Sequence, residues 1–200
     1  MGWFPDEAAA WAAAVDGDAE GLAVVFDRYL DRVYRHALRL SGSRHDAEDL
    51  TAGAFLELWR RRRQVRMVDG SVLPWLLVTV TNLARNRARG LRRYRRLLAS
   101  LPRTESIHPG ADDILDQQIA AGSAKRLQQA LGQLSASQAA LVSLVSFEGY
   151  TPAQAAGVLG ITPAAARTRL HRARRRIELA LAGEPTPPDG LLPSLEDHPT

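Results

Sequence analysis

The chain has 200 residues, a hydrophobic content of 46%, a formal net charge of +4 and no cysteine. The lack of cysteine excludes disulfide bonds, thiolate metal sites and a cysteine nucleophile. Ala, Leu and Arg dominate the composition and strand-like runs of Val, Ile and Thr are scarce, so we expect an all-α fold.

Residues 1–17 are expected to be an N-terminal extension with a short helix around 6–15. The first residues, MGWFPDEAAAWAAAVDGDAEG, lack the basic segment of a signal peptide. No apolar run in the chain approaches the roughly 20 residues that a membrane span requires. We therefore expect a cytoplasmic protein without membrane insertion.

Residues 18–96 have the pattern of a first domain built from three helices. The first helix, over 18–40, has apolar side chains at spacings of three and four, which form one stripe. This stripe consists of Leu22, Val25, Phe26, Tyr29, Val33, Ala37 and Leu40. The second helix has acids in its first turn, where they complement the helix dipole, and runs to about Arg62. It is expected to bury Leu50, Ala54, Phe55 and Leu58.

A loop over 61–74, with turn chemistry at Asp69-Gly70, precedes a third helix that begins near Pro74. Arginine then nearly vanishes over 97–121, where two prolines and four acids indicate a flexible linker. A second small helical domain is expected over 122–182. The tail, 183–200, has five prolines and is expected to be disordered, although its GLLPSLEDH segment could instead dock on a protein surface.

Positive charge is gathered into three blocks, 60–66, 85–96 and 167–176. These blocks hold 18 of the 26 Lys and Arg residues and contain no acid. Segregation of this kind is the electrostatic pattern of a protein that binds a polyanion. The alternative is a set of solvated helix faces.

Two Thr-Pro pairs in the second domain each predict a helix start. Thr151 and Thr162 are favourable N-caps, and proline is well tolerated at the first helical position. Gly160 ends the first, short helix, and the second runs from Pro163 to about Leu181. A short helix, a glycine turn and a longer helix form a helix-turn-helix unit, whose second helix enters the DNA major groove.

The second helix of this unit carries the third arginine block on its outward face. Small residues at its start permit a close approach to base edges, and arginines pair with guanine or phosphate. The expected outward residues are Ala164, Ala165, Arg167, Thr168, His171, Arg172 and Arg175. A basic helical hairpin that binds no DNA is the alternative.

The sequence thus predicts two helical DNA-binding domains joined by an acidic linker. This organisation resembles the extracytoplasmic-function (ECF) sigma factors, which are two-domain members of the sigma-70 family. In the first domain, FDRYLDRVYRHALRLSG, DAEDLTAGAFLELWRRR and PWLLVTVTNLARNRARGLRR resemble sigma region 2. In the second domain, EGYTPAQAAGVLGI and TRLHRARRRI resemble region 4. The chain departs from the family pattern at Ala52-Gly53, where Gln-Glu is usual, and at Ser135, where proline is usual.

The resemblance implies a subunit that binds core RNA polymerase through the β′ clamp helices and the β flap. The residues implied at the polymerase are Asp46, Glu48, Asp49, Leu50, Phe55, Glu57 and Trp59. For Leu50 and Trp59, a place in the domain core is an equal alternative. The resemblance also implies an anti-sigma factor as a partner, and neither cofactor, metal nor catalytic residue.

The resemblance further implies two sites on promoter DNA. At the single-stranded -10 element, Asn82 and Asn86 would surround a flipped base beside the loop 63–73, with Arg85, Arg87, Arg89, Arg92 and Arg93 along the backbone. The two asparagines could equally be plain surface residues. At the -35 duplex, the implied set is Thr162, Ala164, Ala165, Arg167, Thr168, Arg169, His171, Arg172 and Arg175.

Two other classes of protein remain as alternatives. A simple helix-turn-helix repressor or activator would bind a palindrome as a dimer without polymerase, but residues 18–96 resemble neither a ligand-binding nor a receiver domain. An enzyme on nucleic acid would need a carboxylate cluster or a nucleophile. The acids at 46–49 have a poor geometry for two metals, and the five histidines show no ligand spacing.

Overall fold

A computed structural model describes residues 6–100 and 129–182 of the chain. Within these ranges every regular element is a helix, apart from one isolated antiparallel bridge between Val68 and Ser71. The all-α prediction is confirmed. Most of the expected linker and the whole of the proline-rich tail lie outside the described residues.

The first domain contains α1 (Glu7–Asp16), α2 (Ala19–Ser41), α3 (Arg44–Arg61) and α4 (Leu73–Ser100). Side chains of Asp6, Asp18 and Ser43 cap the first three helices. Glycines with left-handed backbones, Gly17 and Gly42, end α1 and α2. The helix starts agree with the predicted ones within a few residues, whereas α4 continues four residues past the predicted end of the domain at 96.

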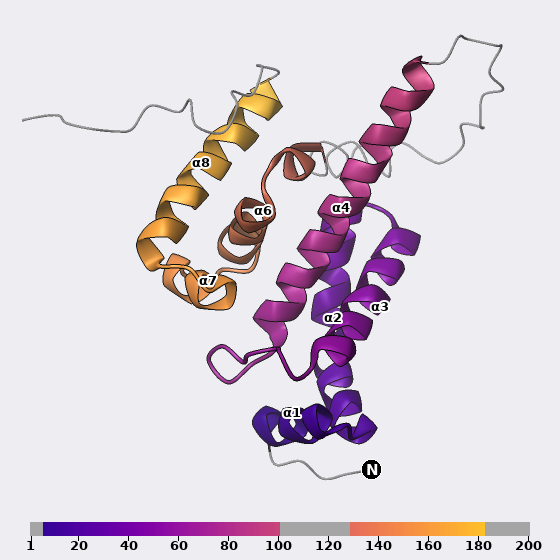
Figure 1. Ribbon diagram of the computed structural model, residues 1–200, viewed down its shortest axis with the longest axis vertical. Helices are drawn as coiled ribbons and strands as arrows, with labels where there is room; N and C mark the ends of the chain where they lie inside the picture. Colours follow the sequence, from indigo (N-terminus) through magenta and orange to yellow (C-terminus); the bar gives the residue numbers. More distant parts are fainter. Residues whose placement is uncertain (1–5, 101–128, 183–200) are drawn as a thin grey trace, which may run out of the picture.

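Helices α2, α3 and α4 pack side by side around the core of this domain (Figure 1). The core takes one stripe from each helix, and its fully buried members include Val33, Ala37, Leu40, Ala54, Leu58, Leu76, Leu77 and Val80. Phe26, expected on the buried stripe of α2, is 36% exposed at the edge of the core, where its ring lies 4.7 Å from that of Phe55.

Helix α1 crosses the end of α2 in close backbone contact (Figure 1). A Cβ atom at Gly21 would lie 2.4 Å from the carbonyl oxygen of Ala10 and 2.8 Å from the amide nitrogen of Ala14. Only glycine therefore permits this crossing. Trp11 is buried beneath it, so the N-terminal extension is an integral part of the domain.

The second domain contains α6 (Ala136–Val142), a π-helical turn η1 (Ser143–Phe147), α7 (Pro152–Leu159) and α8 (Pro163–Ala182). Ser135 and Thr151 open α6 and α7 with capping boxes that Gln138 and Gln154 complete. Gly160, at φ 63°, makes the turn between α7 and α8. The predicted helix-turn-helix is confirmed, and Ser135 caps its helix in place of the usual proline.

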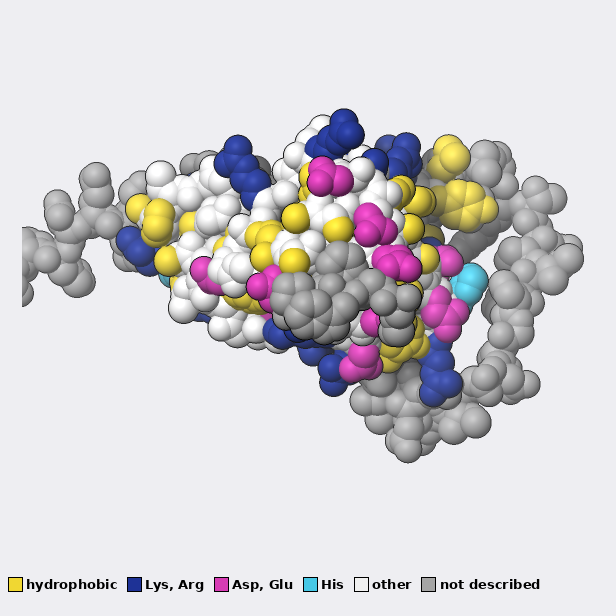
Figure 2. Space-filling view, turned by 90° about the horizontal axis from the view of Figure 1, so that it is seen from below, with side chains coloured by type: hydrophobic (Ala, Val, Ile, Leu, Met, Phe, Trp, Pro, Cys, Tyr) yellow, Lys and Arg dark blue, Asp and Glu magenta, His cyan; other side chains and the backbone are white. Residues whose placement is uncertain are grey.

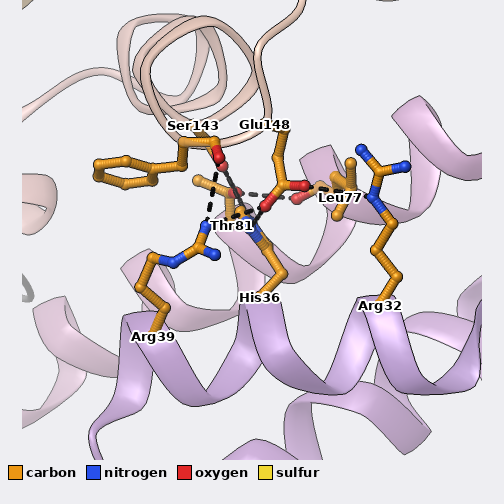
Figure 3. Close-up of polar contacts among 8 residues, drawn as sticks. Arg32, His36, Arg39, Leu77, Thr81, Ser143 and Glu148 are labelled. Atoms are coloured by element: carbon orange, nitrogen blue, oxygen red, sulfur yellow. Dashed lines mark hydrogen bonds and ion pairs between the residues drawn. The ribbon is translucent and has the colours of Figure 1, made fainter.

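The two domains contact each other, because α6 and η1 pack along α4 (Figure 1). His36 of α2 is buried at this contact. Its Nδ1 donates to Oε1 of Glu148 over 2.8 Å, and its Nε2 lies 2.9 Å from the hydroxyl of Ser143 and 3.1 Å from that of Thr81 (Figure 3). Arg32 and Arg39 flank the same carboxylate at 3.4 and 3.0 Å. A closed polar network thus joins the domains.

Candidate nucleic-acid interface

The C-terminal half of α4 carries a ladder of arginines and projects beyond the bundle (Figure 1). Arg85, Arg89, Arg92 and Arg96 follow one another at spacings of four, three and four, so they share one helix face. Burial, and then the neighbouring Arg89, lowers the pKa of Arg85. Burial also lowers the pKa of Arg92, with Arg96 and Arg89 contributing. Like charges held this closely create a field that favours an anion.

The predicted -10 residues differ in their exposure. Asn86, Arg87, Arg89 and Arg93 are exposed, and Asn82 and Arg92 are half-buried. The Oδ1 atom of Asn82 is buried without a hydrogen-bond partner among the described residues.

Arg85 differs from its expected role. It is only 8% exposed, and its Nε donates to the carbonyl oxygen of Leu134 in the second domain over 2.8 Å. In this arrangement of the domains it is therefore not available to a DNA backbone.

A small hairpin lies between α3 and α4, within the loop that the resemblance assigns to base capture. Val68 and Ser71 exchange backbone hydrogen bonds of 2.9 and 3.1 Å. Asp69 and Gly70 both have positive φ, 51° and 73°, as a two-residue type I′ turn requires. The predicted Asp69-Gly70 turn is confirmed. At the hairpin tip, the Asp69 carboxylate accepts a 3.0 Å hydrogen bond from the Gln154 amide of α7.

Helix α8 presents an outward face that agrees with its sequence pattern, except that Ala165 is half-buried. Ala164, Arg167, Thr168, His171, Arg172 and Arg175 are exposed, whereas Ala166, Leu170 and Ala173 are buried. Thr162 is exposed, and its side chain caps the helix by accepting from the Ala165 amide at 3.2 Å. Arg169 turns aside and donates to the Ser137 hydroxyl at 3.0 Å.

On α3, two of the expected polymerase-binding residues belong to the core. Leu50 and Phe55 are only 6% and 5% exposed, because they lie on the stripe that packs against α2 and α4. They are therefore not part of an exposed surface. Leu56, which sequence reasoning missed, is 58% exposed. It lies seven residues after Asp49, two helical turns along the same face, and this spacing could have identified it.

The acids of α3 are tied to the basic helix α4. Arg87 forms ion pairs with Asp46 and Asp49, the latter at 3.4 Å. Glu48 is exposed, whereas Glu57 and Trp59 are half-buried. A Cβ atom at Gly53 would lie 3.3 Å from Cδ1 of Leu83, so the departure from the family pattern lies at the contact between α3 and α4.

Acidic side chains gather at the end of the molecule opposite the projecting end of α4. Figure 2 views this end, where several Asp and Glu side chains are spread among hydrophobic and other side chains, and Lys and Arg side chains lie toward the margins. Among the described residues, no group of three or more His, Asp or Glu could hold a metal ion, and no helix is long and apolar enough to cross a membrane.

Comparison with known proteins identifies the family. The chain matches Sigma-70 region 2 over residues 25–96 and Sigma-70, region 4, over residues 124–177. It is 30% identical over 166 residues to the ECF RNA polymerase sigma factor SigM of Mycobacterium tuberculosis, covering 83% of this chain and 80% of SigM. The chain belongs to the sigma-70 family, among its ECF sigma factors.

Other ECF relatives extend the likeness over most of the chain. It is 36% identical over 158 residues to SigE of Mycolicibacterium smegmatis, covering 78% of this chain and 59% of SigE. It is 31% identical over 172 residues to the RNA polymerase sigma factor CarQ of Myxococcus xanthus, covering 84% of this chain and 93% of CarQ. The solved structure of CnrH in complex with the cytosolic domain of CnrY shares the fold, with a TM-score of 0.51, 18% identity and coverage of 90% of this chain and 99% of that one.

In this sigma factor, the region 2 match covers most of α2, all of α3, the hairpin and most of α4, and the described part of the region 4 match, residues 129–177, includes α6, α7 and most of α8. Helix α1 precedes the region 2 match.

Proposed function

We propose that this sigma factor binds core RNA polymerase and directs it to promoters with a -35 duplex and a -10 element that melts. The observation that carries the proposal is the pair of arginine-rich helices, α4 and α8, held on separate domains of one sigma-70 chain. The chemistry of RNA synthesis would belong to the polymerase, so the chain needs no catalytic residue of its own. Its place of action is then the cytoplasm.

Region 4 would place α8 in the major groove of the -35 element. The small Ala164 and Ala165 permit close approach, and Arg167, Arg172 and Arg175 supply the contacts to guanines and phosphates. Arg169 would support α8 against α6 through Ser137 instead of reading bases.

Region 2 would hold the -10 element as a single strand between the hairpin and α4. Asn82 and Asn86 can bond base edges that a duplex hides, and the arginine ladder of α4 tracks the backbone. Arg85 would join this ladder once the two domains separate and release it from Leu134.

For the contact with core polymerase, we propose the exposed face of α3. Glu48, Asp49 and Leu56 form its centre, with Asp46, Glu57 and Trp59 beside them. An exposed leucine within a polar rim is the usual anatomy of a protein interface. The β′ clamp helices and the β flap are the proposed partners, and an anti-sigma factor would cover the same surfaces.

In vitro transcription from genomic promoter fragments tests this function. With core polymerase and this chain together, we expect transcripts that start at defined positions and that neither component gives alone. If the chain instead binds a palindrome without polymerase and yields no defined transcripts, it is a simple helix-turn-helix regulator and the proposal is wrong.

A further inference from the structure

Glu7, the first residue of α1, is a buried acid for which region 2 has no assigned use. It is only 7% exposed, and its two carboxylate oxygens have separate partners. Oε1 accepts a 2.8 Å hydrogen bond from the backbone amide of Val72. Oε2 accepts a hydrogen bond from the Tyr29 hydroxyl and lies 3.5 Å from Arg28. One side chain therefore connects α1, α2 and the start of α4.

The groups that Glu7 holds are the end of the hairpin and the first turn of α4. The Tyr29 hydroxyl also lies 2.9 Å from Oγ of Ser71, and that same Oγ accepts a 3.1 Å hydrogen bond from the Leu73 amide. Burial, and then the hydrogen bond to Glu7, raises the pKa of Tyr29, so the hydroxyl keeps its proton. Ser71 and Val72, the last residues before α4, are thus both anchored through Glu7.

The hydrogen bond between Glu7 and the Val72 amide stabilises the start of α4 and the position of the hairpin. Val72 is completely buried, so without Glu7 its amide would have no partner, a costly state. The amide also lies at the N-terminus of α4, where the helix dipole favours a negative charge. An isolated two-stranded hairpin is marginal in water, so its position depends on such external contacts.

We propose that Glu7 is a positioning residue for the -10 element: it fixes the hairpin 68–71 against α4 and so shapes the pocket for the flipped base. The inference rests on the proposed function of region 2 and adds α1 to it. A binding pocket is specific only when the surrounding side chains hold it rigidly in its productive geometry. Glu7 provides this support from outside the segment that matches the family.

The test compares base capture by holoenzymes assembled with variant chains. Fluorescence anisotropy measures binding of a labelled single strand carrying the -10 element, intact or with one base removed at each position in turn. The variants are Glu7→Ala, Glu7→Gln and Tyr29→Phe. Asp16→Ala is the matched control, because Asp16 is an exposed acid at the other end of α1. Affinities for core polymerase and for a -35 duplex are measured in parallel.

For the native chain and Asp16→Ala, we expect removal of the base at one position to weaken binding of the strand by about fivefold or more, which is the contribution of one stacked base. Glu7→Ala should reduce this preference for the intact strand to less than about twofold at that position, with unchanged affinity for core polymerase and the -35 duplex. Glu7→Gln should keep the native preference for the intact strand, because its amide oxygen can still accept a hydrogen bond from the Val72 amide and its amide nitrogen can donate one to the Tyr29 hydroxyl. Tyr29→Phe should lower this preference, because it removes the hydroxyl between Glu7 and Ser71 and leaves every charge in place.

The inference is overturned if Glu7→Ala keeps the preference, or if all three affinities fall together, which indicates a purely structural role. If Glu7→Ala does not fold, Tyr29→Phe decides, and an unchanged preference in that variant overturns the inference. A native holoenzyme that prefers the intact strand at no position overturns the proposed function of the hairpin itself, and the inference with it.

Discussion

At the scale of single residues, the direction of each arginine decides its role. The exposed arginines of α8 differ in their contacts with the rest of their own domain. Arg167, Arg172 and Arg175 point outward, whereas Arg169 and Arg174 reach back to Ser137 and Ser146 on the domain's own surface. Equal charge at neighbouring positions therefore does not imply equal contact with DNA, and the difference can be measured.

Replacing Arg172 by alanine should weaken binding of the holoenzyme to -35 duplex DNA by about 1–3 kcal/mol if the side chain reads a base. If it contacts a phosphate, the slope of log affinity against log salt should instead fall by about one. Arg174→Ala removes the same charge from a side chain that donates to Ser146 of the same domain, and it is the control. Electrophoretic or anisotropy titrations at several salt concentrations distinguish the two, and equal losses in both variants would contradict the different roles assigned to Arg172 and Arg174.

Glu148 makes the contact between the domains sensitive to acid. Burial raises its pKa, but the hydrogen bond and charge of His36, together with Arg39, outweigh burial and hold it below the ordinary value of 4.5. A lowered pKa means that this stabilisation is complete above the ordinary value and disappears as the pH falls through the lowered one. Arg32 also lies 3.4 Å from this carboxylate, and Tyr150 is close enough to interact electrostatically with both Arg32 and Glu148.

We therefore expect the radius of gyration of the free chain, measured by small-angle scattering, to increase as the pH falls below the ordinary pKa of Glu148. In Glu148→Gln the side chain is neutral at every pH, as in a protonated Glu148. This variant should therefore have a looser domain contact already at neutral pH and show no further change from this site. A variant that keeps the native radius at every pH would show that the network does not hold the domains together.

At the scale of elements, α1 and α2 meet through backbone atoms, and glycine is the condition for this contact. Gly21→Ala would bring a Cβ atom to 2.4 Å from the Ala10 carbonyl oxygen, so α1 must shift. We expect a loss of about 1–3 kcal/mol in the free energy of unfolding, as for other overpacked sites.

Gly90→Ala in α4 is the matched control, because a Cβ atom there meets nothing within 4 Å. It should leave stability unchanged or raise it by up to about 1 kcal/mol, since alanine favours a helix. Urea denaturation followed by circular dichroism measures both. Equal stability of the two variants would mean that α1 is not packed against α2 as described.

The helices themselves could be predicted from the sequence because their signals are local. Caps such as Thr151 and Gly160 act within a few residues of where they stand, and the structure confirms both. The long-range contacts could not be predicted. Glu7 reaches Val72 across 65 positions, and His36 meets Glu148 across 112. The helix pattern correctly predicted that Leu50 and Phe55 are buried, whereas the resemblance implied a polymerase-binding role for both.

At the scale of the whole molecule, the described arrangement is too compact to hold both promoter elements. Positions -35 and -10 lie roughly 85 Å apart along duplex DNA, whereas a compact chain of 200 residues is roughly 40 Å across. A segment as long as residues 101–128 can span up to roughly 90 Å when extended. We therefore predict that the domains separate when they bind both promoter elements, which would also free Arg85.

The native lack of cysteine makes this separation measurable. Dyes on Ala12→Cys in α1 and Glu178→Cys in α8, both at exposed positions, report the distance between the domains. Energy transfer should be high in the free chain and should fall in the complex with core polymerase and promoter. The control is a doubly labelled chain with both dyes in the first domain, at Ala12→Cys and Ala23→Cys, which should not change. Unaltered transfer between the domains would contradict the separation.

Permanganate footprinting of a promoter that the chain activates tests directly whether the chain and core polymerase together open the -10 element. We predict that unpaired thymines become reactive in the -10 element only when the chain and core polymerase are both present, with protection of a separate -35 duplex. Protection of a single palindromic site by the chain alone, with no thymine reactivity, would contradict it.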